Sequence, residues 1–369
     1  MLIAYLLISS SLATTPAKTC IDYEIPVTIE FLNYIIAKPF QSNYDVVDLV
    51  SNLASRTAAT DFQPYSGAAL QTASYTISAT FCAPGDTASS TGIVLLASHG
   101  LNFDRSYWDP SISPASYSFV DFAIARGYSV FYYDRLGVGK SSLVSGYLAQ
   151  ASNQVAILQN LAHEIKEGNY TGELGIPKSL ILIGHSFGSS ISAAAATVEP
   201  DICDGLVLTG FSYNGTNGAG FLEALQPRIA ATQSPGKWHQ LDTGYITGVD
   251  LFSSINVFFK APDYNPAVTK YANENKQPFA INEAISTAIV DTQAKNFTGV
   301  AMIITGQYDL IFCTGQCDAV IEHPAASIFS KAKAFEAISF PGAGHGLNFA
   351  SNATLAFKRI TDFLGANGL

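Results

Sequence analysis

The sequence predicts an α/β fold in which helices cover both faces of a mostly parallel sheet. From residue 91 onward, short apolar runs alternate with longer segments whose apolar residues recur at helical spacing, a pattern typical of βαβ units. The 369-residue chain is 48% hydrophobic and only 13% charged, which excludes a disordered chain and allows a large core. The length fits one large α/β domain with an insertion, or two small domains.

Apolar runs mark the predicted buried strands of this sheet. They are TGIVLLASHG (91–100), GYSVFYYD (127–134), KSLILIGHS (178–186), DGLVLTGF (204–211), GVAMIITGQYD (299–309) and FEAISFPG (335–342). Between them, residues 115–126 and 149–167 show helical periodicity, with Val155, Leu158 and Leu161 along one face. Strands joined by such helices are expected to pair in parallel.

Two alternating segments, residues 21–31 and 73–81, predict an N-terminal β extension. Period-2 alternation of apolar and polar residues is typical of half-buried strands, so the two segments could pair as antiparallel neighbours. Cys20 and Cys82 stand at the outer ends of these segments, and the pairing would bring their sulfur atoms together.

The other cysteines predict one short loop closure and one free thiol. Cys313 and Cys317 form a C-x-x-x-C pattern that could close a small loop. The chain has 5 cysteines, an odd number, and Cys203 has no other cysteine near it in sequence, so it is the expected free thiol. No second Cys or His pair occurs at zinc-ligand spacing, and no metal or other cofactor is expected.

The N-terminus, MLIAYLLISSSLATTPA, is expected to be a secretory signal peptide at residues 1–17. Its apolar run is too short to span a bilayer and is followed by small residues, although no Lys or Arg precedes it. Cleavage after Ala13 or Ala17 fits equally well, and an N-terminal core strand or a membrane anchor is the alternative. Sequons for N-glycosylation begin at Asn169, Asn214, Asn296 and Asn352. Composition alone would give roughly 3 such sequons, so they add little to the expectation of a secreted glycoprotein.

The charge of the chain argues against a nucleic-acid partner. A net charge of −10 leaves no excess of Lys and Arg to bind phosphates. The segment DRLGVGKSS (134–142) is similar to a phosphate-binding loop, but the position of the first glycine holds Asp134. We therefore expect a small apolar organic partner rather than a nucleotide, and no stable membrane span.

Residues 213–296 interrupt the strand pattern and predict a largely helical cap. No run comparable to the earlier strands occurs there, and aromatic residues such as Trp238, Phe258 and Phe259 are spread through it. These aromatic side chains either cover an apolar substrate or form the cap's own core. A long insertion in an α/β domain is usually a lid or small subdomain, which would set substrate choice and leave the chemistry to the core.

The stretch GHSFG (184–188) fits G-x-S-x-G and makes Ser186 a candidate nucleophile. In this pattern the serine lies on a tight turn between a buried strand and a helix, where the glycines leave room for neighbouring backbone. The short pattern alone is weak evidence, and a structural turn is the alternative.

A serine hydroxyl needs a base and a group that orients the base, and candidates for both occur later in the chain. Asp309 ends the run GVAMIITGQYD, and His345 follows the run FEAISF in the segment GAGHG. The other histidine after Asp309 is His323, which precedes a proline without a strand leading into it. His163 and His185 are interpreted as surface or packing residues.

Two backbone N–H groups are the candidates for an oxyanion hole. One is that of Phe187, directly after the serine, and the other is that of Leu101, in the loop after the run 91–100. Tyr107 and Trp108, further along this loop, either line the substrate pocket or pack in the core.

Residues 91–369 resemble the α/β-hydrolase superfamily. The motifs that carry the resemblance are HGLNFDRSYWD, YYDRLGVGKSS, GHSFG, GQYD and GAGHG, in this order. The strands before residue 91 look like the extension of fungal secreted members. The resemblance implies an α/β-hydrolase fold with Ser186 as nucleophile, His345 as base, Asp309 as its partner, and Leu101 and Phe187 as backbone oxyanion donors.

Some members of the superfamily depart from this pattern in the acid or the nucleophile. Some take their acid after the preceding strand, where this chain offers only Ser212, Tyr213 and Asn214. A serine at position 186 separates the chain from the epoxide hydrolases and haloalkane dehalogenases, which use an aspartate there.

The expected function is that of a secreted serine hydrolase. It would cleave a carboxylic ester, or else an amide or lactone, of an apolar substrate through an acyl-enzyme. A biosynthetic enzyme of the same fold that performs cyclisation or carbon–carbon bond cleavage is the alternative, as is an inactive binding protein. The expected organisation is a signal peptide (1–17), an α/β-hydrolase core with its N-terminal extension (18–212), a cap (213–296) and a second part of the core (297–369).

Overall fold

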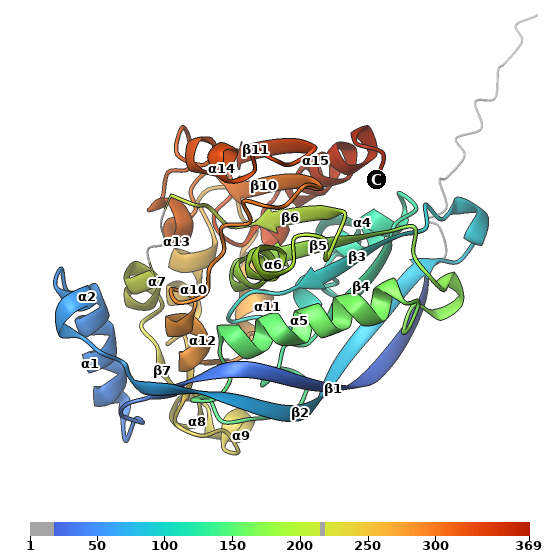
Figure 1. Ribbon diagram of the computed structural model, residues 1–369. Helices are drawn as coiled ribbons and strands as arrows, with labels where there is room; N and C mark the ends of the chain where they lie inside the picture. Colours follow the sequence, from blue (N-terminus) through green and yellow to red (C-terminus); the bar gives the residue numbers. More distant parts are fainter. Residues whose placement is uncertain (1–17, 215–217) are drawn as a thin grey trace, which may run out of the picture.

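A central eight-stranded sheet organises the part of the chain that the computed structural model describes, residues 18–214 and 218–369 (Figure 1). The expected signal peptide lies outside the described residues. The strands are β1 (Lys18–Ile36), β2 (Tyr65–Pro84), β3 (Ile93–Ser98), β4 (Ser129–Tyr133), β5 (Ser179–His185), β6 (Gly205–Thr209), β10 (Val300–Gly306) and β11 (Ala334–Phe340). Their order across the sheet is β1-β2-β4-β3-β5-β6-β10-β11.

Six neighbouring strands, in the order β4-β3-β5-β6-β10-β11, are parallel to one another, as the sequence predicts. Each of them corresponds to one of the apolar runs. Every residue of β3 and β10 is buried. Burial on both faces explains why these runs are apolar throughout instead of alternating with polar residues. The mostly parallel sheet is therefore confirmed.

Helices pack on this sheet in two groups. Those of the core are α3 (Pro114–Tyr117), α4 (Phe119–Ile124), α5 (Ala151–Lys166), α6 (Phe187–Val198), α13 (Leu310–Cys313), α14 (Glu322–Ile328) and α15 (Ala353–Ala366). Helices α5 and α6 pack on β5 and on each other, whereas α4 and α15 pack on β4 and β10 and on each other. The predicted helix at 115–126 is divided, because Ser118 has an extended backbone and its side chain accepts the N–H of Asp121 to begin α4.

The N-terminal extension is a long antiparallel ribbon of β1 and β2. The register places Cys20 opposite Cys82, as the alternation predicts, but both strands are longer than the segments 21–31 and 73–81. Only residues 79–82 of β2 pair with β4, and the rest of the ribbon passes along α5 (Figure 1). Between the two strands lie α1 (Asn43–Ala54) and α2 (Ala58–Asp61), which the sequence pattern did not predict.

The cysteines pair as the sequence indicates. Disulfides join Cys20 to Cys82 and Cys313 to Cys317. All five cysteines lie in the described part of the chain, and Cys203 is buried without a disulfide partner. The first disulfide links the two strands of the ribbon, and the second closes the loop after α13.

The insertion, residues 213–296, combines helices with a small sheet of its own. Its described elements are α7 (Gly218–Leu225), β7 (Arg228–Ile229), α8 (Ala230–Gln233), α9 (Pro235–Trp238), β8 (Tyr245–Thr247), α10 (Leu251–Phe258), α11 (Pro266–Glu274), β9 (Phe279–Ala280) and α12 (Ile281–Ser286). The order β7-β8-β9 forms the antiparallel small sheet. Helix α1 packs on α7 and β7, so the N-terminal extension contacts the insertion. In the described ranges, no helix has the length and apolar character needed to cross a membrane.

We predict one free thiol per chain, detectable only after unfolding. Burial raises the pKa of the Cys203 thiol to about 12, so the native protein should not react with a thiol reagent near neutral pH. Denaturation without reductant should release one thiol, and Cys203→Ser should abolish it. Native reactivity, or peptide mapping that joins Cys203 to another cysteine, would contradict the pairing.

Candidate active site

Ser186 lies on a sharp turn between β5 and α6. Its backbone φ is +56° and ψ is −118°, a conformation that residues with a side chain rarely adopt. The Ser186 N–H donates to the Thr209 carbonyl at 2.9 Å, which ties the turn to the end of β6. The serine is 9% exposed at the carboxyl end of the parallel strands.

Glycines around the turn allow three backbone segments to approach closely. A Cβ atom on Gly188 would collide with the Ser98 carbonyl of β3, and one on Gly184 would collide with the backbone of Gly188. A Cβ atom on Gly100 would lie 2.9 Å from the Ser186 Cβ. The loop after β3 is therefore held directly against the serine.

His345 and Asp309 form a buried pair. The His345 Nδ1 lies 2.6 Å from the Asp309 Oδ2, and both side chains are 0% exposed. Asp309 immediately precedes α13, and its Oδ1 accepts the backbone N–H groups of Ile311 at 2.8 Å and Phe312 at 2.9 Å. The helix start thus orients one carboxylate oxygen, and the other oxygen orients the imidazole.

The far nitrogen of His345 is unpaired. In the described part of the chain, the buried His345 Nε2 has no hydrogen-bond partner. The ring is stacked against Phe312 at 5.8 Å, and it lies 5.9 Å from Phe258 and 4.9 Å from His185 between ring centroids. Because His185 directly precedes Ser186, these contacts bring the imidazole to the serine turn.

His185, the residue before Ser186, is buried and neutral. Burial first, and then the neighbouring His345 and His99, hold the pKa of His185 well below its ordinary value. Its ring stacks on Tyr107 at 4.3 Å, and its Nδ1 lies 3.2 Å from the Thr209 Oγ1. His185 is therefore a neutral packing residue.

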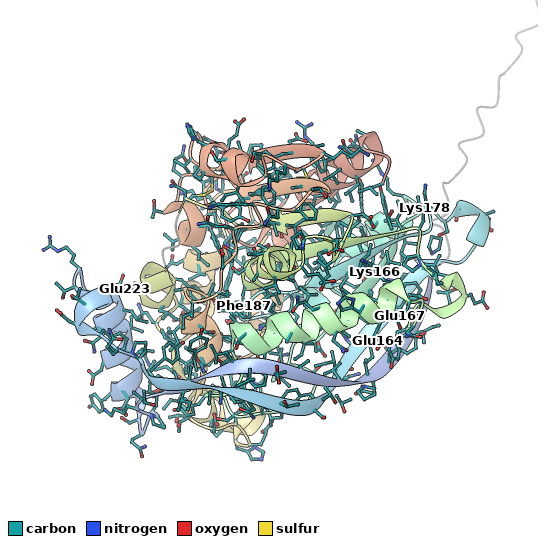
Figure 2. All side chains as sticks on the ribbon, viewed as in Figure 1. Glu164, Lys166, Glu167, Lys178, Phe187 and Glu223 are labelled. Atoms are coloured by element: carbon teal, nitrogen blue, oxygen red, sulfur yellow. A yellow bond between two sulfur atoms is a disulfide. The ribbon has the colours of Figure 1, made fainter. Side chains whose placement is uncertain are left out.

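An apolar cavity of about 260 Å³ opens onto Ser186. Leu101 and Phe187, the candidate oxyanion residues, line it together with the serine, and Phe187, labelled in Figure 2, is buried. The other lining residues include Leu53, Phe221, Leu222, Phe258, Ile285, Ile311 and Phe312. Residues from the core, the insertion and the N-terminal extension therefore share one cavity.

Some residues lie elsewhere than the sequence suggested. Leu53 belongs to α1, a helix that the sequence pattern did not predict, so no local signal pointed to it. Trp238 packs in a separate cluster that includes Tyr245, away from the cavity lining. Tyr107 and Trp108 are buried in the core, which resolves their role in favour of packing.

No metal centre is found in residues 18–214 and 218–369. No group of three or more His, Cys, Asp or Glu side chains there could hold a metal ion.

Comparisons with known proteins agree with this fold. The family model described as the alpha/beta hydrolase family matches residues 93–357. A search of curated proteins finds no match.

Solved structures with the same fold share little sequence with the chain. A thermophilic esterase from Thermogutta terrifontis is 17% identical with a TM-score of 0.54, and the match covers 79% of this chain and 94% of the esterase. A bromoperoxidase from Bacillus anthracis is 18% identical with a TM-score of 0.55, covering 79% and 96% of the two chains. E-2-(acetamidomethylene)succinate hydrolase, at 17% identity and a TM-score of 0.52, gives the same coverages of 79% and 96%. From the family model and the shared fold, the chain belongs to the α/β hydrolase family.

Proposed function

We propose that the protein is a serine hydrolase that cleaves a carboxylic ester of an apolar substrate through an acyl-enzyme. The observation that carries the proposal is the buried His345–Asp309 pair. Its imidazole has an unpaired Nε2, and its ring centroid lies 4.9 Å from that of His185, the residue before Ser186. Phe258 and Phe312 contact the imidazole and also line the cavity that contains Ser186. Membership of the hydrolase family supports this chemistry.

In the proposed first half-reaction, Ser186 is the nucleophile and His345 the general base. The Ser186 Oγ attacks the ester carbonyl carbon while the His345 Nε2 takes the hydroxyl proton. Asp309 holds the proton on Nδ1 and stabilises the imidazolium that forms. The proton then passes to the leaving alcohol as the ester C–O bond breaks, which leaves the acyl group on Ser186.

In the second half-reaction, water takes the place of the serine. His345 removes a proton from water as the oxygen attacks the acyl carbon, and it returns the proton to the Ser186 Oγ as the acid leaves. Both tetrahedral intermediates carry a negative oxygen, which the backbone N–H groups of Leu101 and Phe187 would stabilise. Phe187 begins α6, where the first N–H groups of the helix have no partner within it.

The cavity lining supports an apolar substrate. Its side chains are mostly aliphatic and aromatic, so they favour the hydrocarbon part of an ester over a charged group. Phe221, Leu222, Phe258 and Ile285 come from the insertion, which supports a role for residues 213–296 as a cap over the substrate.

We also infer that the protein is secreted. The Cys20–Cys82 and Cys313–Cys317 disulfides support this, because such bonds persist in oxidising compartments. N-terminal sequencing of protein recovered from the culture medium of a eukaryotic host tests it, and a start at residue 14 or 18 is expected.

Labelling with a fluorophosphonate tests the proposed function. The reagent should modify Ser186 irreversibly, and a screen of p-nitrophenyl esters of increasing acyl length should find turnover. An inactive binding protein would neither react with the fluorophosphonate nor turn over the esters. An enzyme without an acyl intermediate would keep its turnover after Ser186→Ala.

Removal of the nucleophile or the base should nearly abolish ester hydrolysis. Ser186→Ala and His345→Ala should each lower kcat by about 10⁴-fold or more with an unchanged circular dichroism spectrum, because the two side chains act as a unit. The double variant should be little worse than either single variant. If steady-state kinetics show that the kcat loss of the double variant is the product of the two single losses, Ser186 and His345 do not act as a unit.

Asp309→Asn should also be severe, with a kcat loss of about 10³- to 10⁴-fold. The amide cannot stabilise the imidazolium, and it favours the wrong imidazole tautomer. Asp318→Asn is the matched control, because the exposed Asp318 bonds Ser339 and Gln307 rather than the histidine. A mild effect of Asp309→Asn in the same kinetic assay would show that another group supports His345.

Truncation of Phe221 should change substrate preference. Phe221→Ala enlarges the cavity, so the ratio of kcat/KM values between long and short acyl esters should shift by about 1 to 2 kcal/mol. Trp238→Ala removes an aromatic residue of similar exposure from the separate cluster and should lower the melting temperature alone. Equal losses on every ester for Phe221→Ala would mean that its role is structural.

A further inference from the structure

A fully buried ion pair joins the loop after β4 to the insertion. Arg135 and Glu283 are both 0% exposed, and the Arg135 Nη1 donates to the Glu283 Oε1. The same oxygen accepts the Gln154 Nε2 at 2.9 Å. Burying two charges costs free energy that their attraction often fails to offset, so the position of the pair calls for a reason other than stability.

The pair leaves polar atoms unsatisfied. Among the described residues, the buried Arg135 Nε and Glu283 Oε2 have no hydrogen-bond partner. Each such atom costs about 1 to 3 kcal/mol. Burial raises the pKa of Glu283, and the adjacent guanidinium opposes this by favouring the carboxylate.

The other end of Arg135 holds the loop that carries Leu101. Its Nη2 donates to the Gly100 carbonyl at 3.3 Å, and the His99 Nδ1 donates to the same oxygen at 2.9 Å. The His99 Nε2 accepts the backbone N–H of Arg135 at 3.1 Å, which fixes the neutral tautomer. Burial, and then the charge of Arg135, hold the pKa of His99 well below its ordinary value, so the tautomer persists.

Fixing the Gly100 carbonyl also fixes the Leu101 N–H. The two groups belong to one planar trans peptide and point in opposite directions. With the carbonyl bound to Arg135 and His99, the N–H faces away from them. Gly100 itself lies against Ser186, so this peptide is in reach of the reacting carbon.

Arg135 also contacts the second candidate donor residue. Its guanidinium carbon lies 4.7 Å from the centre of the Phe187 ring, a cation–π contact. One side chain therefore contacts the Gly100 carbonyl, which belongs to the same peptide as the Leu101 N–H, and the ring of Phe187.

We propose that Arg135 and Glu283 are positioning residues of the oxyanion hole, with Glu283 holding Arg135 and Arg135 holding the Gly100–Leu101 peptide and Phe187. This inference rests on the proposed function and extends it. The insertion then contributes to the chemistry through Glu283, whereas the sequence pattern suggested that it sets substrate choice alone.

Glu283→Gln and Arg135→Lys test the proposal. The first removes the charge and keeps a hydrogen-bonding oxygen. The second keeps a cation opposite Glu283 but lacks the planar fork that reaches Gly100 and stacks on Phe187. Asn282→Ala is the matched control, because Asn282 is a buried neighbour in α12 that bonds the Tyr34 and Tyr147 carbonyls instead.

The kinetic measurement is kcat per active site, with sites counted by fluorophosphonate titration. Each test variant should lose about 10- to 100-fold in kcat, and affinity for a trifluoromethyl ketone, which forms an oxyanion with Ser186, should fall in parallel. The KM and the binding of a non-reacting ether analogue should change by less than about threefold. Asn282→Ala should lower the melting temperature and keep the kcat per site.

Two outcomes overturn the proposal. One is that Glu283→Gln and Arg135→Lys lower the melting temperature while kcat per site and ketone affinity stay at the wild-type level. The other is a crystal structure of either variant in which the Gly100–Leu101 peptide keeps its orientation. The crystal structure also separates this inference from the proposed function. If Ser186 does not react with the fluorophosphonate, the proposed function fails, whereas the orientation of the Gly100–Leu101 peptide in the variants still tests the role of Arg135 and Glu283. If one variant does not fold, the kinetic measurement and the crystal structure are both obtained with the other variant.

Discussion

The close approach of backbone segments around Ser186 is the constraint on which the rest of the site depends. The turn at Ser186 holds the residue at a φ of +56°, and this is possible only because Gly100, Gly184 and Gly188 have no side chains to collide. The parallel pairing of β3, β5 and β6 brings the loops after these strands to one edge of the sheet. Ser186 therefore lies between the loop after β3, which contains Gly100, and the start of α6 at Phe187.

Buried polar groups around this turn are arranged in two chains of contacts. One runs from the start of α13 through Asp309 to His345, and every step is a short hydrogen bond. The other runs from Glu283 through Arg135 to the Gly100 carbonyl. In both chains, low polarity strengthens each hydrogen bond and makes an alternative arrangement costly, so each buried group has one favoured orientation.

The insertion and the N-terminal extension enclose the site from outside the sheet. The insertion supplies cavity side chains, and the Phe258 carbonyl accepts the N–H of Gly346, directly after His345, at 2.7 Å. The extension supplies Leu53 and packs through α1 on α7. Segments that are far from Ser186 in sequence therefore determine the shape of the cavity and the surroundings of the imidazole.

From the sequence alone we predicted the parallel core, the cysteine pairing and the candidate residues Ser186, Asp309 and His345. These follow from local signals: apolar runs of strand length, glycines at a tight turn, and polar residues directly after strands. Other features became known from the packing of the folded chain: Leu53 lines the cavity, Trp238 does not, and Arg135 pairs with Glu283 across 148 residues of sequence. A contact between distant segments depends on how whole elements pack, and a single buried charge or leucine has no local sequence pattern that indicates its partner.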